Sequence, residues 1–169
     1  MGEYGIRIVT SLYLPDEAAS RTLALALAAS APAPAVVYLH GDLGSGKSTL
    51  ARAWLRALGV TGTVRSPTYT LVERYRLAGE AEALHLDLYR IGGAAELEYL
   101  GLDEAAAALW LVEWPERGAG GLPPADLHVH LAVSGDGRAV RLEAASGRGE
   151  AWLQRLPPGD LRPIPEPDQ

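Results

Sequence analysis

The segment from Gly41 to Ser48 restricts this 169-residue chain more than any other, because it matches the phosphate-binding loop G-x-x-x-x-G-K-[ST]. Residues 35–40 before it are apolar and β-branched, as in a buried strand, and residues 49–58 after it favour a helix that ends at Gly59. Glycines let the loop amides approach phosphate oxygens, and the helix directs its positive end at the same oxygens. The segment therefore predicts a site for a nucleotide phosphate.

Lys47 is the only lysine of the chain, which has 15 lysine and arginine residues in total. A compact ammonium group suits this loop, whereas a planar guanidinium fits it poorly. We expect Lys47 to reach the β- and γ-phosphates and Ser48 to offer its hydroxyl to Mg²⁺. The loop residues predicted to bind the nucleotide are Asp42, Leu43, Gly44, Ser45, Gly46, Lys47, Ser48 and Thr49.

The order of the expected elements indicates an α/β protein with a P-loop NTPase-like three-layer fold, whose mixed β-sheet carries antiparallel additions. One ATPase domain is expected over residues 1–156, followed by a poorly ordered, proline-rich tail over 157–169. Besides the strand and helix around the loop, the chain predicts strands over 4–9, 71–77, 83–89, 109–112, 126–133 and 138–145, and helices over 16–30, 96–100, 103–108 and 149–156. The second and third of these strands form a candidate hairpin, and the last two carry a strong hairpin signal between them.

Composition restricts the function classes. The net charge is −6 and the pI about 5.2, which argues against a protein that binds nucleic acid by itself. No apolar run approaches the length of about 18 residues that a membrane span needs. The chain has no cysteine and no secretory signal pattern, so a cytoplasmic location is expected.

Two acidic residues are the candidates to complete an ATP site. Glu113 ends an apolar strand, as a Walker B acid does, and is assigned to Mg²⁺. Asp87 lies within a strand, where a carboxylate is costly to bury without partners, so a functional role is favoured. Asp87 either orients the attacking water or holds a Mg²⁺-bound water, and both alternatives stay open.

Other polar and aromatic residues allow weaker interpretations. Ser66, Thr68 and Thr70 follow the phosphate-loop helix, where nucleotide-sensing loops are often found, or they simply shape the turn at Pro67. Trp114 is either a core residue or an anchor for a partner. His128 and His130 share one face of a strand and could bind a metal, but their alternation with Leu127, Val129 and Leu131 favours an ordinary half-exposed strand.

The motifs together resemble the TsaE (formerly YjeE) family of bacterial P-loop ATPases that take part in the biosynthesis of tRNA threonylcarbamoyladenosine. The blocks that carry the resemblance are GDLGSGKS at 41–48, SPTYTLVE at 66–73, HLDLYR at 85–90, ELEYLG at 96–101 and LVEWPE at 111–116. The blocks follow the family's order and spacing, and the resemblance as a whole spans roughly residues 14–145. The resemblance implies a weak, Mg²⁺-dependent ATPase that is stimulated by the TsaB–TsaD heterodimer, which modifies position 37 of tRNAs that read codons starting with A. Contact with tRNA is implied only through that complex.

The resemblance also implies roles for individual residues. Lys47 and the loop amides bind the phosphates, Ser48 and Glu113 bind Mg²⁺, and Asp87 acts with Lys47 in hydrolysis. Trp114 matches the family's functional tryptophan, and Asp16 and Arg138 fall where further nucleotide contacts are expected. Two alternatives remain, namely a small P-loop kinase and a nucleotide-binding scaffold without turnover. A GTPase is disfavoured, because the chain has no Asn/Thr-Lys-x-Asp segment.

Overall fold

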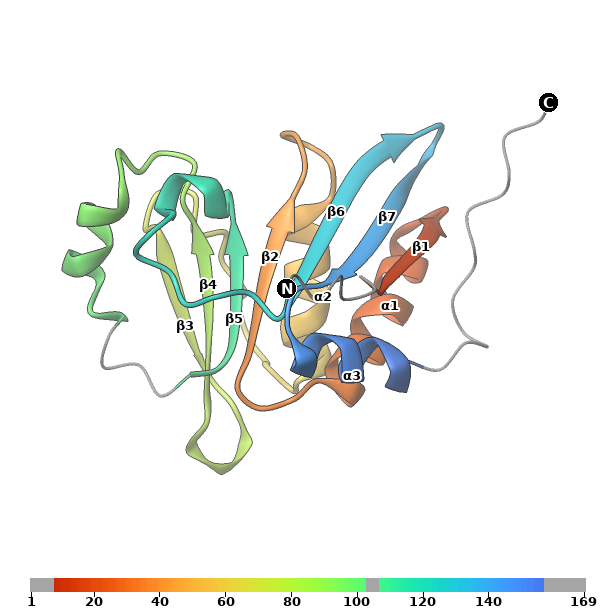
Figure 1. Ribbon diagram of the computed structural model, residues 1–169, viewed down its shortest axis with the longest axis horizontal. Coiled ribbons are helices and arrows are strands. Elements are labelled where there is room, and N and C mark those ends of the chain that lie inside the picture. Colours follow the sequence, from red (N-terminus) through yellow and green to blue (C-terminus); the bar gives the residue numbers. More distant parts are fainter. Residues whose placement is uncertain (1–7, 103–106, 157–169) are drawn as a thin grey trace, which may run out of the picture.

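The computed structural model describes residues 8–102 and 107–156, which form one seven-stranded mixed sheet with helices (Figure 1). The strands are β1 (Val9–Leu14), β2 (Ala35–His40), β3 (Val72–Arg76), β4 (Glu82–Asp87), β5 (Ala107–Glu113), β6 (Leu127–Ser134) and β7 (Gly137–Ala144). The helices are α1 (Glu17–Ser30), α2 (Lys47–Ala57) and α3 (Gly147–Arg155), with 3-10 helices η1 (Ala78–Glu80), η2 (Ala94–Leu100) and η4 (Pro115–Gly118). Among the described residues, no helix has both the length and the apolar character needed to cross a bilayer.

The centre of the sheet is parallel and its two edges are antiparallel. The strand order is β1-β7-β6-β2-β5-β4-β3, in which β6, β2, β5 and β4 run parallel. The β6–β7 and β3–β4 pairs are the two predicted hairpins, and β1 pairs antiparallel with β7. Because parallel strands end at the same edge, the carboxyl ends of β2, β4 and β5 meet where the phosphate loop begins.

Each face of the sheet has its own apolar core. On one face, α1, α2 and α3 bury side chains such as Leu27, Trp54 and Trp152 against the inward residues of the central strands. Figure 1 shows α1 and α2 together behind the sheet, with α3 beside the end of α1. On the other face, short 3-10 segments rather than α-helices cover β4 and β5. There Leu86 of β4 and Leu97 of η2 belong to a second cluster of buried apolar side chains.

Side-chain alternation decides which face each acid occupies. In β5, Leu109 and Leu111 belong to the helix-covered core, so Glu113, two residues on, points to the face covered by α2. In β4, Ala83 belongs to that same core, which places Asp87 on the same face. The sheet thus presents both carboxylates beside the start of α2.

Two predicted elements need correction. The first strand was predicted over 4–9 but begins at Val9 and continues to Leu14. Pairing with β7 favours this range, because it buries Leu12 and Leu14. Residues 1–7 lie outside the described part. The helix predicted over 103–108 is wrong at its end, since Ala107 already belongs to β5, and its residues 103–106 lie outside the described part. There, pairing with β4 overrides the helix preference of alanine. The predicted tail, 157–169, also lies outside the described residues.

Candidate functional site

The phosphate loop adopts a backbone that glycine permits. Gly41, Gly44 and Gly46 have φ angles of 150°, 79° and 106°, in the region that L side chains rarely adopt. A side chain at Gly41 would collide with Ser45 and with the carbonyl of Leu131. Gly46 is the N-cap of α2 and has no side-chain capping partner, so the first amides of this helix stay available to a ligand.

Lys47 lies inside this loop and is only 5% exposed. Its ammonium donates a hydrogen bond to the carbonyl of Gly41 and lies 3.9 Å from the ring centre of Trp114. Burial lowers the pKa of Lys47 below its ordinary value, while the nearby carboxylates of Glu113 and Asp87 act in the opposite direction. The cation is therefore held by one carbonyl and one aromatic face, both of which a phosphate group can replace.

Glu113 is the centre of a buried polar cluster and is 2% exposed. The hydroxyl of Ser48 lies 3.2 Å from its Oε1 and 3.3 Å from its Oε2. His85, also 2% exposed, places Nε2 2.7 Å from Oε2 of the same carboxylate. One carboxylate thus joins the first turn of α2 to strand β4.

Asp87 lies opposite Glu113 in the register of β4 and β5. Its Oδ1 accepts a hydrogen bond of 3.0 Å from the amide of Tyr89. Within residues 8–102 and 107–156, this amide is the one donor that hydrogen-bonds to the Asp87 carboxylate. We refer to Ser48, His85, Asp87 and Glu113 as the cleft cluster.

Arg138 reaches the loop from β7, which is distant in sequence. Its Nε donates to the carbonyl of Ser45 at 3.0 Å and its Nη2 to that of Gly44 at 3.3 Å. Arg138 therefore stabilises the loop from the side opposite Glu113 and Asp87. Arg138 also lines two neighbouring depressions of the surface, and so it marks their common boundary.

The larger depression is a cleft of about 260 Å³ over the loop. Its lining residues are Leu43, Gly44, Ser45, Gly46, Lys47, Ser48, Thr49, Thr68, Asp87, Tyr89, Glu113, Trp114 and Arg138. An adjoining cleft of about 190 Å³ shares Gly46, Thr49 and Arg138 with it and extends to Asp16 at the start of α1. We call these the phosphate cleft and the adjoining cleft.

Most of the predicted site residues meet in the phosphate cleft, and three do not. Asp16 lines the adjoining cleft, where its carboxylate also caps α1 by accepting from the amide of Ala19 at 2.9 Å. Asp42 is exposed and lines neither cleft. Thr70 points elsewhere and donates to Glu73 at 3.0 Å.

The remaining candidates have local partners. Ser66 and Thr68 are hydrogen-bonded to each other at 2.7 Å, and Thr68 lines the phosphate cleft. Trp114 has a positive φ of 57°, an unusual conformation for a bulky residue, which places its ring against Lys47. His128 and His130 lie on the sheet face opposite the phosphate cleft, together with His40.

Two residues of the site were missed by the sequence interpretation. His85 contacts the carboxylate of Glu113, and Tyr89 lines the phosphate cleft with its ring 4.9 Å from that of Trp114. The signal for His85 was present, because it lies two residues before Asp87 in a strand and must share its face. Tyr89 belongs to the HLDLYR block at 85–90, but its place in the cleft depends on how the chain turns after β4, which the sequence does not specify.

The fold and the site define a P-loop nucleotide-binding protein of the α/β class. The family model described as "Threonylcarbamoyl adenosine biosynthesis protein TsaE" matches residues 14–140. The chain belongs to the TsaE family.

Curated relatives and a solved structure agree with this assignment. A tRNA threonylcarbamoyladenosine biosynthesis protein TsaE from Haemophilus influenzae is 44% identical over 68% of this chain and 73% of its own length. The protein of the same name from Bacillus subtilis is 36% identical over 72% of this chain and 77% of its own length. The crystal structure of Bacillus subtilis YdiB superposes with a TM-score of 0.74 at 27% identity, covering 89% of this chain and 95% of that one.

Proposed function

We propose that this protein is a Mg²⁺-dependent ATPase that supports the TsaB–TsaD complex in forming N6-threonylcarbamoyladenosine at position 37 of tRNAs reading codons that start with A. The observation that carries the proposal is the joint position of Lys47, Glu113 and Asp87 around one cleft at the phosphate loop. A loop that only held a nucleotide would not require two buried carboxylates beside its cation. Their burial is therefore the main support for turnover.

The residues present suit Mg²⁺. The hydroxyl of Ser48 and the carboxylate of Glu113 are hard oxygen donors that already lie within hydrogen-bond distance of each other. Magnesium is usually held by one or two carboxylates together with nucleotide phosphates, so these two residues fit the ion. When bound, the ion would supply neutralisation of the charge that develops on the phosphates.

Other residues of the chain bind the phosphates, support the loop and orient the reacting groups. Lys47 and the free amides at the start of α2 bind the phosphates, and Arg138 holds the loop in the shape that those amides require. His85 fixes the orientation of the Glu113 carboxylate. Asp87, with the amide of Tyr89 on one oxygen, has its second oxygen available to orient the attacking water. The adjoining cleft extends from the loop to Asp16 and has room for the nucleoside part of ATP.

Family membership and charge support the pathway and the partners of this proposal. Membership in a family named for threonylcarbamoyladenosine biosynthesis supports the reaction, and the acidic net charge of −6 supports contact with tRNA only through the complex. A cytoplasmic location belongs to the same proposal.

A steady-state phosphate-release assay with and without TsaB–TsaD tests the proposal. We expect slow, Mg²⁺-dependent release by the protein alone and a clear increase with the heterodimer. ADP formation that requires a small-molecule acceptor, with the phosphoryl group on the acceptor and no release of inorganic phosphate, would instead indicate a kinase. Tight nucleotide binding without release under either condition would indicate a scaffold.

A further inference from the structure

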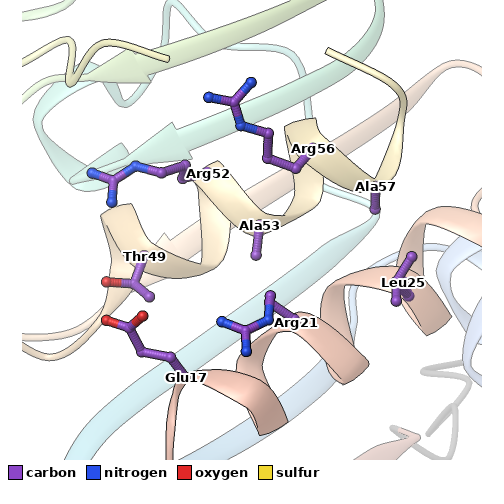
Figure 2. Close-up of a pocket in the computed structure, with 8 residues that line it drawn as sticks. All are labelled: Glu17, Arg21, Leu25, Thr49, Arg52, Ala53, Arg56 and Ala57. Atoms are coloured by element: carbon purple, nitrogen blue, oxygen red, sulfur yellow. The ribbon is translucent and has the colours of Figure 1, made fainter. Parts of the chain in front are cut away.

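Another depression of the surface lies between α1 and α2, apart from the two clefts at the phosphate loop. It is a groove of about 280 Å³ (Figure 2). Helix α1 contributes Glu17, Arg21 and Leu25, which are spaced four residues apart and so lie in one row. Helix α2 contributes Thr49, Arg52, Ala53, Arg56 and Ala57.

The groove is open because the residues at its base are short. Ala53 and Ala57 lie on the α2 side of the seam, where longer side chains would fill the space between the helices. Leu25 borders the same space and is 58% exposed, although Leu23 and Leu27, the other leucines of α1, are fully buried in the core. An exposed leucine beside a hollow base offers a place for another apolar side chain.

The rim of the groove is cationic. Arg56 donates hydrogen bonds to the carbonyls of Val60 and Gly62. Arg21 and Arg52, by contrast, make no hydrogen bond or ion pair within residues 8–102 and 107–156. Three arginines against one glutamate give the groove a positive local charge in a chain whose net charge is −6.

The groove borders the nucleotide site. Thr49, in the first turn of α2, lines the groove, the phosphate cleft and the adjoining cleft. Glu17 lines both the groove and the adjoining cleft, and Figure 2 shows its carboxylate directed towards Thr49. A molecule seated in the groove would therefore contact the helix turn that presents the phosphate-binding amides.

We propose that the α1–α2 groove docks a protein segment that carries acidic side chains next to an apolar one, and that this segment belongs to the partner complex. This inference rests on the proposed function and adds the contact surface to it. Acidic side chains of the partner segment pair with Arg21 and Arg52, which is the charge complementarity that the groove offers. The apolar side chain of the segment enters the space beside Leu25. Glu17 and the apolar base make the groove a poor match for a nucleic-acid backbone.

The test is the affinity of the full-length protein for TsaB–TsaD in the presence of Mg²⁺ and ATP. The double charge reversal Arg21→Glu with Arg52→Glu is expected to weaken binding by at least about tenfold. Its affinity for a fluorescent ATP analogue should stay that of the wild type, because neither arginine lines a nucleotide cleft. The single variants Arg21→Glu and Arg52→Glu have Arg76→Glu, on edge strand β3, as their matched control. It reverses one exposed arginine outside the groove, changes the net charge equally and should leave binding unchanged.

The outcomes separate this inference from the proposed function. If the wild type does not bind the heterodimer, the partner assignment and the groove fail together. If the wild type binds and the double variant binds equally well, the groove alone is refuted. If Arg76→Glu weakened binding to the heterodimer as much as the groove variants do, the effect would be a general one of charge. If the wild type bound isolated tRNA and the double variant did not, the groove would be a nucleic-acid site. Either result overturns the proposal.

Discussion

The two faces of the sheet each place histidine near glutamate, but in different surroundings. On the face covered by α2, His85 lies 2.7 Å from the Glu113 carboxylate, which also contacts Ser48. On the opposite face, His40 has another imidazole as its nearest polar partner, with its Nε2 2.8 Å from Nδ1 of His128. The first arrangement leaves a carboxylate directed at a cleft, whereas the second consists mainly of imidazoles that contact one another.

The surroundings determine what each histidine can do. Burial lowers the pKa of His40 to about 4, and the neighbouring His130 and His128 contribute to this decrease, against a weaker opposite effect of Glu143. His40 is thus neutral near pH 7, with its ring stacked on that of His130 at 4.6 Å. We refer to His40, His128 and His130 as the histidine face. We infer that the cleft cluster serves chemistry and the histidine face serves packing, a division that variants on the two faces can test.

Asp87→Asn is expected to have the largest effect. An amide cannot accept a proton or present a negative charge to the attacking water, so partner-stimulated hydrolysis should fall by roughly 100- to 10,000-fold. Nucleotide affinity should be retained, because Asp87 is not needed to hold the phosphates. Phosphate release and equilibrium binding, measured on the same sample, check both statements. His128→Asn, a comparable change on the histidine face, should leave both quantities unaltered, and unchanged release by Asp87→Asn would remove this residue from the mechanism.

Lys47→Ala should lower ATP affinity by about 10- to 100-fold, the range expected for the loss of a charge-assisted hydrogen bond. Titration with a fluorescent ATP analogue measures this, and Lys47→Arg tests whether charge without the compact ammonium is sufficient. Because Lys47 is the only lysine, the wild type offers a second test. Mg²⁺ and ATP should protect its ε-amine from acylation, as read from the peptide mass. Equal labelling with and without nucleotide would contradict a phosphate contact at this residue.

Much of the cleft cluster was predictable because its residues are local to strong patterns. The loop motif specified Lys47 and Ser48, and the apolar strand that ends in Glu113 specified the Walker B position. The strand pattern drew attention to Asp87 as an acid between two leucines, and side-chain alternation along β4 explains why it shares the face of Glu113. These assignments depend only on the chain near each residue and on the rule that parallel strands end at one edge.

The rest depended on contacts between segments that are distant in sequence. His40 and His128 meet only because β2 pairs with β6, and no local pattern specifies that register. The α1–α2 groove likewise needs the relative position of two helices that are separated by β2. The prediction of a helix over 103–108 is wrong at Ala107 and Ala108 for the same reason, since pairing with β4 decided the structure of Ala107.

His85→Ala compares the two faces directly with His40→Ala. Loss of the hydrogen bond to Glu113 should weaken Mg²⁺ affinity by about tenfold, in the range seen when residues that orient metal ligands are replaced. Binding of Mn²⁺ in place of Mg²⁺, followed by electron paramagnetic resonance with a non-hydrolysable ATP analogue, measures this without turnover. His40→Ala should leave this affinity unchanged.

A conservative variant separates positioning from stability. His85→Gln places an amide donor near the position of Nε2 and should restore part of the metal affinity. If the role of His85 were purely structural, the metal affinity of the variants would instead fall in proportion to their melting temperatures. If His40→Ala and His85→Ala weaken Mn²⁺ binding equally, the division between the two faces is wrong.

The smallest expected effect concerns the pH dependence of stability. Because the pKa of His40 is about 4 in the folded protein and 6.5 for an unperturbed histidine, the unfolded chain binds more protons between these pH values. Stability should therefore be fully present above about pH 6.5 and decrease as the pH falls towards 4, and the lowered pKa of His130 acts in the same direction. His40→Gln cannot titrate, so the slope of unfolding free energy against pH should become shallower by less than one proton. Urea unfolding at intervals across this range measures the slope. A variant slope equal to that of the wild type would mean that His40 is not held neutral by burial and its neighbours, and the description of the histidine face as neutral packing would be wrong.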